Sequence, residues 1–139
     1  MLNNTVNVSV RYSETDQLKV VYYSRYFEYF EIGRRSLLTA YGFPYSEMES
    51  KFNCYLPVLD TYAKFIKPAK LEDEITVVSK VLEKPSVRIR FDHEILCGEK
   101  LLVTGYVTCV FFDGITSRPS QPPNKLLELF NAHFRINEE

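Results

Sequence analysis

The hydrophobic residues of this chain change their spacing once, near Ser24, and this change limits the fold more than any other feature. Before it, in the stretch NVSVRYS, apolar and polar residues alternate. The apolar side of the alternation consists of Val6, Val8, Val10 and Tyr12. Strict alternation is typical of a strand that is buried on one face only. We therefore expect a half-buried strand that reaches Tyr12.

From Ser24 to Tyr41 the spacing becomes that of a helix, and Gly42 follows as a stop signal. The residues that recur at helical spacing are Phe27, Phe30, Arg34, Leu37, Leu38 and Tyr41. Ser24 is a suitable N-cap residue. Gly33 lies inside the predicted helix, where glycine costs about 1 kcal/mol relative to alanine. A close approach of another part of the backbone would explain this glycine.

Four later segments are predicted strands. They are LPVLDTYAKFIKP, EITVVSKVLEK, VRIRFDHEIL and LLVTGYVTCVFF. The third places His93 on its apolar face, which indicates a hydrogen-bonded histidine in the core. The short sequence CGEK predicts a hairpin turn before the last strand. A proline-rich connector and a short amphipathic helix, KLLELFNAHF, follow. The order predicts one α+β domain over residues 1–139, with a long helix packed on a five-stranded antiparallel sheet.

The composition excludes several kinds of partner and site. A formal net charge of -1 provides no overall basic field for nucleic acid. Three widely spaced cysteines without a CxxC motif favour neither a disulfide framework nor a zinc site. The first residues lack the pattern of a signal peptide, and the longest uncharged run, Leu101 to Phe112, is too short to span a bilayer. We therefore expect a cytoplasmic protein that binds no metal and does not cross a membrane.

The stretch VRYSETDQLKVVYYSRYFEYFEIGR resembles the start of the 4-hydroxybenzoyl-CoA thioesterase family and of related acyl-CoA thioesterases. The positions that fit the family pattern are Thr15, Asp16, Val20, Val21, Tyr22, Tyr23, Tyr26, Glu31 and Arg34. Later stretches resemble the later strands of the family, so the resemblance covers nearly the whole chain. It implies the hot-dog fold, in which a five-stranded antiparallel sheet wraps around one long helix, here with a short C-terminal helix.

The sequence departs from the family pattern at two positions. Lys19 stands where the family has glycine, and Tyr23 stands where many members have histidine. Lysine adopts positive φ angles less readily than glycine does. We therefore expect Lys19 to affect the geometry of the loop that contains Asp16.

The resemblance implies an enzyme that hydrolyses the thioester of a short-chain, medium-chain or aromatic acyl-CoA to the free acid and coenzyme A. The thioester is the substrate, and no further cofactor is implied. Asp16 would be the general base or the nucleophile, and the Tyr23 amide would donate to the oxyanion. From the residues alone, Asp16 is better explained as a turn residue, and it is the resemblance that favours catalysis. Three other functions stay open: a non-catalytic acyl-CoA-binding domain, a thioesterase for acyl carrier protein, and a hydratase, although neither His93 nor His133 lies in the loop.

Substrate contacts are predicted less directly. Tyr22 and Tyr26 would line an acyl pocket or pack in the core or at a dimer contact. Coenzyme A phosphates require lysine or arginine. The candidates are Lys64, Lys67, Arg88, Arg90 and Arg118. Each of them is also explained as a solvated surface charge. The resemblance further implies a homodimer or homotetramer in which the partner subunit contributes to the site.

Overall fold

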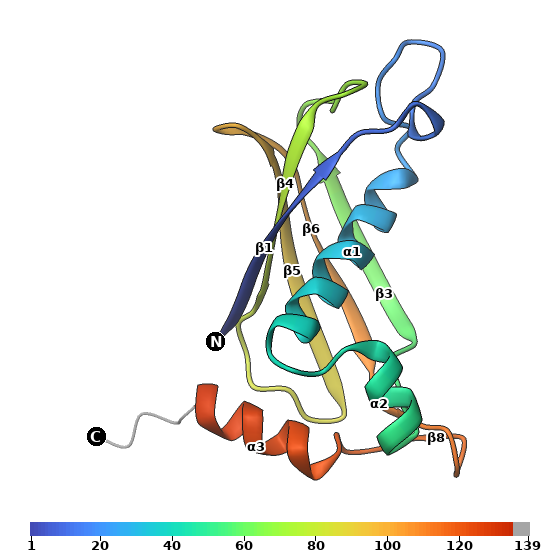
Figure 1. The fold of residues 1–139 in the computed structure, drawn as a ribbon, viewed down its shortest axis with the longest axis vertical. Coiled ribbons are helices and arrows are strands. Elements are labelled where there is room, and N and C mark those ends of the chain that lie inside the picture. Colours follow the sequence, from blue (N-terminus) through green and yellow to red (C-terminus); the bar gives the residue numbers. More distant parts are fainter. Residues whose placement is uncertain (135–139) are drawn as a thin grey trace.

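The computed structural model describes residues 1–134 and contains a five-stranded sheet (Figure 1). In spatial order, its strands are β1 (Leu2–Ser9), β4 (Glu74–Val81), β5 (Arg88–Cys97), β6 (Lys100–Val110) and β3 (Val58–Phe65). Every pair of neighbouring strands is antiparallel. This confirms the predicted sheet. The single domain expected for residues 1–139 includes residues 135–139, which lie outside the described residues.

The long helix α1 (Arg25–Ala40) lies across one face of the sheet (Figure 1). Its buried residues are Tyr26, Tyr29, Phe30, Gly33, Leu37 and Leu38. They belong to the same hydrophobic core as the inward-facing residues of the strands. Each large side chain that is fully buried contributes roughly 1.5–3 kcal/mol, so this face of α1 joins the two layers. The predicted hot-dog arrangement is confirmed. Ser24 occupies the N-cap position, but its side chain makes no capping hydrogen bond.

Gly33 lies where α1 comes close to the sheet. A Cβ atom at this position would lie 2.4 Å from Ser79 Oγ and 2.8 Å from Val77 Cγ1, both on β4. Contacts this short leave no room for a side chain on the helix. The close approach of the sheet is therefore confirmed, but the nearest atoms belong to side chains and not to the backbone, as had been expected.

His93 of β5 is a core residue, with only 2% of its surface exposed. Its ring stacks on Phe30 of α1 with 4.7 Å between ring centres. Nδ1 lies 2.8 Å from Ser79 Oγ, but Nε2 has no hydrogen-bond partner within residues 1–134. The prediction of a hydrogen-bonded core histidine is therefore right for one ring nitrogen only. Burial, with a smaller effect from Arg34, lowers the pKa of His93 to about 3.

The predicted strand that reached Tyr12 was too long. β1 ends at Ser9, and residues Tyr12–Glu14 form the short 3-10 helix η1. Tyr12 is consequently 68% exposed rather than on the buried side of a strand. The chain turns here because the Arg11 N–H donates to the Glu14 side chain at 2.9 Å instead of continuing the strand ladder.

The sequence-based prediction missed one helix and a small sheet. The helix α2 (Tyr45–Phe52) follows α1 and buries Met48. The small sheet consists of β2 (Cys54–Tyr55), β7 (Phe112–Asp113) and β8 (Arg118–Pro119). The C-terminal helix α3 (Asn124–His133) was predicted, and it buries Leu126 and Phe130. Among residues 1–134, no helix is both long enough and apolar enough to cross a lipid bilayer.

Candidate functional site

The segment between β1 and α1 folds into a small hairpin with Asp16 near its tip. The pairs that join its two sides are Glu14 with Tyr22, Thr15 with Val21, and Asp16 with Val20. The second side is also held from outside, because the Val21 N–H donates to the Ala69 carbonyl oxygen at 2.9 Å. Backbone hydrogen bonds therefore fix the position of Asp16.

Asp16 has one carboxylate oxygen in use and one free. Oδ1 accepts a hydrogen bond from the Leu18 N–H at 2.8 Å, so the side chain closes a turn. Oδ2 accepts no hydrogen bond from any group in residues 1–134. The residue is half-buried. Asp16 is thus a turn residue, as the alternative interpretation holds, and it still has an oxygen for a second partner.

Lys19 adopts a left-handed backbone conformation, with φ of +64°. Its N–H donates to the Asp16 carbonyl oxygen at 3.0 Å, and its carbonyl oxygen accepts from the Leu71 N–H at 3.0 Å. A residue other than glycine in this conformation costs roughly 1–3 kcal/mol. The lysine therefore does not remove the turn. Its backbone adopts the conformation that glycine adopts most easily.

The amides just before α1 are available to a ligand. The N–H groups of Tyr23 and Ser24 donate to no acceptor within residues 1–134, whereas the Tyr22 N–H is used by Glu14. Free amides at the start of a helix carry partial positive charge. The chain therefore presents two adjacent donors suited to an oxyanion directly after the Asp16 hairpin.

An open apolar pocket of about 280 Å³ lies beside these amides. Its lining residues are Val21, Tyr23, Tyr26, Phe65, Ile66, Lys67 and Pro68. The rings of Tyr23 and Tyr26 lie 6.4 Å and 5.4 Å from the ring of Phe65, which is at the end of β3. The Tyr26 hydroxyl oxygen accepts the Ala69 N–H at 3.0 Å. Burial raises the pKa of Tyr26, so it stays neutral. We call this the aromatic pocket.

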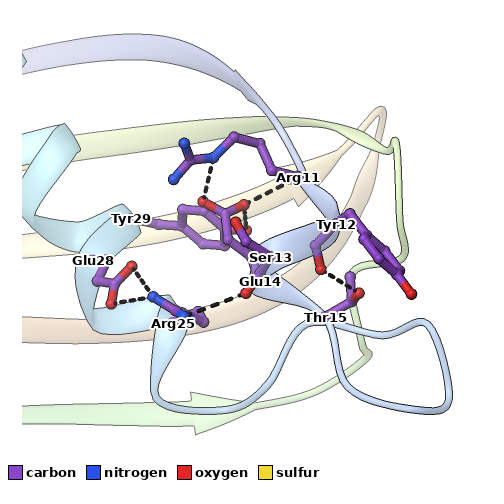
Figure 2. A network of polar contacts seen from close by, with 8 residues as sticks. All are labelled: Arg11, Tyr12, Ser13, Glu14, Thr15, Arg25, Glu28 and Tyr29. Atoms are coloured by element: carbon purple, nitrogen blue, oxygen red, sulfur yellow. Dashed lines mark hydrogen bonds and ion pairs between the residues drawn. The ribbon is translucent and has the colours of Figure 1, made fainter.

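Behind the hairpin, Glu14 forms a buried polar network (Figure 2). Oε1 accepts hydrogen bonds from the Tyr29 hydroxyl at 2.8 Å and from the Arg11 N–H at 2.9 Å, and Oε2 accepts from Arg11 Nε at 3.2 Å. Burial alone would raise the pKa of Glu14, but these three hydrogen bonds outweigh it and hold the pKa below its ordinary value. Burial and the Glu14 carboxylate both raise the pKa of Tyr29.

The family model described as the thioesterase-like superfamily matches residues 10–130. The chain belongs to this superfamily. The resemblance that we drew from the Asp16 segment and the later strands is thereby confirmed.

Three known proteins are similar to this member of the thioesterase-like superfamily. "Putative acyl-CoA thioesterase YneP" of Bacillus subtilis (strain 168) is 43% identical over 61 residues, which are 44% of this chain and 44% of that protein. A probable thioesterase from Bartonella henselae is 27% identical, with a TM-score of 0.82 over 87% of this chain and 99% of that one. A DHNA-CoA thioesterase from Staphylococcus aureus is 25% identical, with a TM-score of 0.85 over 96% and 89%. This chain spans less than half the length of the curated relative.

In this thioesterase-like protein, the predicted aromatic residues gather at one end of α1. Tyr23 and Tyr26 line the aromatic pocket. Tyr22 lies next to it, with 4.8 Å between the Tyr22 and Tyr23 ring centres and 49% of its surface exposed. The hydrophobic pattern did not predict that Phe65, from a different strand, would complete the pocket.

The five predicted cationic residues do not form one cluster. Lys67 lines the aromatic pocket. Lys64 pairs with Thr104, on the face of the sheet that points away from α1. The Arg90 guanidinium lies 4.0 Å from the centre of the Tyr106 ring and pairs with Asp92 at 3.1 Å. The other two, Arg88 and Arg118, lie towards the opposite end of the molecule from the hairpin, where β5 begins and β8 lies (Figure 1).

Glu14 was not predicted as a residue of this site. Its position two residues before Asp16 was visible, but a glutamate in a loop between a predicted strand and a predicted helix suggests an exposed side chain. Glu14 is only 4% exposed. The Arg11 N–H donates to Glu14 three residues later, but arginine has no acceptor atom and is not a capping residue, so no sequence signal marked Glu14. Within residues 1–134, no group of three or more histidine, cysteine, aspartate or glutamate side chains is close enough to hold a metal ion.

Proposed function

We propose that this protein is an acyl-CoA thioesterase that releases a short-chain, medium-chain or aromatic acid from its coenzyme A thioester. The observation that carries this proposal is the order of groups along one short segment. A carboxylate with a free oxygen, two free amides and an aromatic pocket follow one another between Asp16 and Tyr26. The names of the Bacillus and Staphylococcus proteins support the same activity.

In this proposal the thioester carbonyl oxygen points at the Tyr23 and Ser24 amides, which stabilise the negative charge that develops on it. As a general base, Asp16 would take a proton from the water that attacks the carbonyl carbon. As a nucleophile, it would form an anhydride that water then cleaves. In both routes the carbon–sulfur bond breaks, the coenzyme A thiolate leaves and takes up a proton, and the acid is released.

The substitution Asp16→Asn tests the activity. Asparagine keeps an oxygen that can accept the Leu18 N–H, so the turn remains and only the charge is lost. We expect turnover to fall on the order of 100-fold, or about 2.7 kcal/mol of barrier, with a much smaller change in KM. Thiol release from a panel of acyl-CoAs measures both constants. Near-normal turnover of the variant on the best substrate would refute the mechanism.

A matched control is available at the other end of the molecule. Asp113 closes a turn of the same kind, because its Oδ1 accepts the Ile115 N–H at 2.8 Å. Asp113→Asn should therefore leave turnover unchanged. Multiple-turnover reactions in water labelled with oxygen-18 then separate the two roles of Asp16. Label that enters the Asp16 carboxylate over repeated cycles indicates the nucleophile, and label only in the released acid indicates the base.

The same panel distinguishes the alternative functions. A non-catalytic acyl-CoA-binding domain would bind the thioesters without releasing thiol. Acyl carrier protein thioesters present the same pantetheine arm, so they belong in the panel beside the coenzyme A thioesters.

We also propose that the protein works in the cytoplasm, since Cys54, Cys97 and Cys109 are all free thiols.

We further propose that the protein acts as a homodimer that forms across β3. This strand is an edge of the sheet, and it exposes large apolar side chains such as Val58, Leu59, Tyr62 and Phe65, each between 47% and 51%. An exposed apolar edge is a ready site for pairing with another chain.

The charges of β3 favour a second copy of the same strand. Asp60, Tyr62 and Lys64 share the outer face, as their pairing with alternate residues of β6 shows. If two β3 strands pair antiparallel with their two Tyr62 residues opposite each other, Asp60 of each copy faces Lys64 of the other. The pairing therefore continues the sheet and brings opposite charges together.

This two-fold arrangement also completes the site. It places the Phe65 end of one β3 beside the Val58 end of the other. A second apolar pocket of about 530 Å³ lies near Val58. Its lining residues are Tyr45, Glu49, Tyr55, Leu56, Pro57 and Phe112. The aromatic pocket of one copy would then open towards this second pocket of the other.

A charge exchange tests the dimer. Asp60→Lys places two lysines opposite each other and should weaken the dimer in sedimentation experiments. Adding Lys64→Asp restores opposite charges and should restore the dimer. A monomer at micromolar concentration for the wild-type protein, or no recovery in the double variant, would refute the proposed pairing.

For coenzyme A we propose phosphate contacts from Lys67 of one copy and from Arg118 of the other. Lys67 already lines the aromatic pocket, and Arg118 of the small sheet pairs with Asp113, the neighbour of Phe112, which lines the second pocket. Lys67→Glu and Arg118→Glu should each raise KM for acyl-CoA while leaving the turnover number nearly unchanged. Unchanged KM in both variants would refute these contacts.

A further inference from the structure

Glu14 is a charged side chain that the proposed chemistry does not use, although it lies two residues from Asp16. It is 4% exposed, and all of its hydrogen-bond partners are protein groups in the network of Figure 2. A buried carboxylate is costly unless it is fully hydrogen-bonded. Glu14 does not line the aromatic pocket. Any effect of Glu14 on the reaction must therefore come from the way it positions its hydrogen-bond partners, Arg11 and Tyr29, and the segments that carry them.

The contacts of Glu14 connect three parts of the fold at the base of the hairpin. The side chain binds the Arg11 N–H, just after β1, and the hydroxyl of Tyr29, in the second turn of α1. The backbone carbonyl oxygen binds the Tyr22 N–H at 2.9 Å. Tyr22 directly precedes the Tyr23 amide, and Asp16 follows Glu14 by two residues. One residue thus holds both sides of the hairpin against the helix.

Tyr29 is the fixed point of this arrangement. It has no exposed surface, and its ring packs edge-on against Tyr26, with 5.9 Å between ring centres. Tyr26 in turn lines the aromatic pocket. A second, weaker link runs from the exposed side, where Arg25 Nη2 donates to the Ser13 carbonyl oxygen at 3.3 Å. The link through Glu14 is therefore the buried one, sheltered from water.

We propose that Glu14 is a positioning residue for thioester hydrolysis: it fixes the Asp16 carboxylate relative to the Tyr23 amide by tying the hairpin to Tyr29. This inference rests on the proposed function. The Asp16 carboxylate makes no hydrogen bond to α1 within the described residues, whereas the residue that carries the Tyr23 amide is bound to the first turn of α1, because the Tyr26 N–H donates to the Tyr23 carbonyl oxygen at 3.3 Å. Their separation depends on the angle between hairpin and helix, and Glu14 sets this angle. A displacement of about 1 Å between reacting groups can cost about 100-fold in rate.

The test is a double-mutant cycle between Glu14→Gln and Asp16→Asn. Glutamine keeps one oxygen for the Tyr29 hydroxyl and the Arg11 N–H, but it places an amide NH2 group against the Arg11 Nε donor, so the network cannot stay intact. We therefore expect Glu14→Gln to lower the turnover number about 10- to 100-fold and to change KM less than about twofold. In the Asp16→Asn background the same substitution should cost less than about twofold, because no carboxylate remains to be positioned. Glu128→Gln, on the exposed side of α3, is the matched control and should have no effect in either background.

Tyr29→Phe provides a second cycle that leaves Glu14 in place. It removes only the hydroxyl, and the expected loss of turnover is smaller than for Glu14→Gln. If Glu14→Gln fails to fold, the cycle between Tyr29→Phe and Asp16→Asn tests the proposal in its place. A merely structural role predicts a lower melting temperature, with the same turnover per folded molecule or with equal losses in both backgrounds, and either result would overturn the inference. Wild-type protein that releases no thiol from any thioester would instead overturn the proposed function.

Discussion

Replacing Gly33 by alanine is the sharpest test of how the helix and the sheet fit together. On helix propensity alone, Gly33→Ala should stabilise the protein by about 1 kcal/mol. The structure predicts the opposite. The new methyl group would lie 2.4 Å from Ser79 Oγ and 2.8 Å from Val77 Cγ1. The branched side chain of Val77 has little freedom to move away.

The expected loss of stability can be worked out from the side chains that must move to make room for the new methyl group. Relieving such overpacking typically costs about 1–3 kcal/mol. Rotating the Ser79 hydroxyl away breaks its 2.8 Å contact with His93 Nδ1, which leaves the buried imidazole without a partner and costs about 1–3 kcal/mol more. After subtracting the helix gain, we expect the free energy of unfolding to fall by about 3 kcal/mol. For a domain of this size the melting temperature should fall by about 10 °C.

Urea unfolding followed by circular dichroism measures the change. Thr39→Ala, at an exposed position of α1, reports the effect of helix propensity alone and should stabilise slightly. In a protein that already carries Ser79→Ala, the closest contact is absent, so Gly33→Ala should cost clearly less. If Gly33→Ala stabilises the protein, or if its cost is the same with and without Ser79, the packing argument is wrong.

Two further predictions concern strain and pH. Lys19→Gly should raise the free energy of unfolding by about 1 kcal/mol, because glycine adopts the left-handed backbone conformation of this position without strain. The control Gln17→Gly, in the same loop, should lower the free energy of unfolding, and a loss of stability from Lys19→Gly in thermal melts would contradict the prediction. The pKa of His93 is lowered from 6.5 to about 3 in the folded state, so the unfolded chain takes up the proton first as the pH falls. Stability should therefore drop by up to about 1.4 kcal/mol per unit between pH 6.5 and 3, and His93→Phe should reduce this slope in urea titrations; an unchanged slope would contradict the assignment.

The sequence predicts those parts of the fold whose hydrophobic spacing is set by one large buried face. The ends of α1 lie within one residue of the prediction, because its buried residues repeat over four turns. The helix α2 was missed because Met48 is its only buried residue and therefore leaves no period. The strands of the small sheet have two residues each, which is too short for any alternation.

Only the part of the candidate site that lies within one short segment of the chain could be predicted from the sequence. Asp16 and the amides before α1 lie close together in the chain, so strand, loop and helix signals were enough to propose them. Phe65 and Lys67 reach the aromatic pocket from a distant strand, and a single sequence does not show which strand end arrives there. The conformation of the hairpin depends on the hydrogen bond between Glu14 and Tyr29. The local conformational propensities of the hairpin residues do not indicate this contact, because Tyr29 lies in the helix.

The pairing of β1 with β4 has a consequence for the order in which the chain folds. Leu2 pairs with Val81, so β1 leaves the ribosome well before β4 and has no partner until the chain has been made as far as Val81. By contrast, β4, β5 and β6 follow one another and pair as neighbours, which lowers the entropy cost of bringing them together. During this wait β1 is an unpaired strand that can associate with other nascent chains. Its outward-facing residues are Asn3, Thr5, Asn7 and Ser9. These polar side chains make association with another chain unfavourable, and so they protect the protein before it has folded.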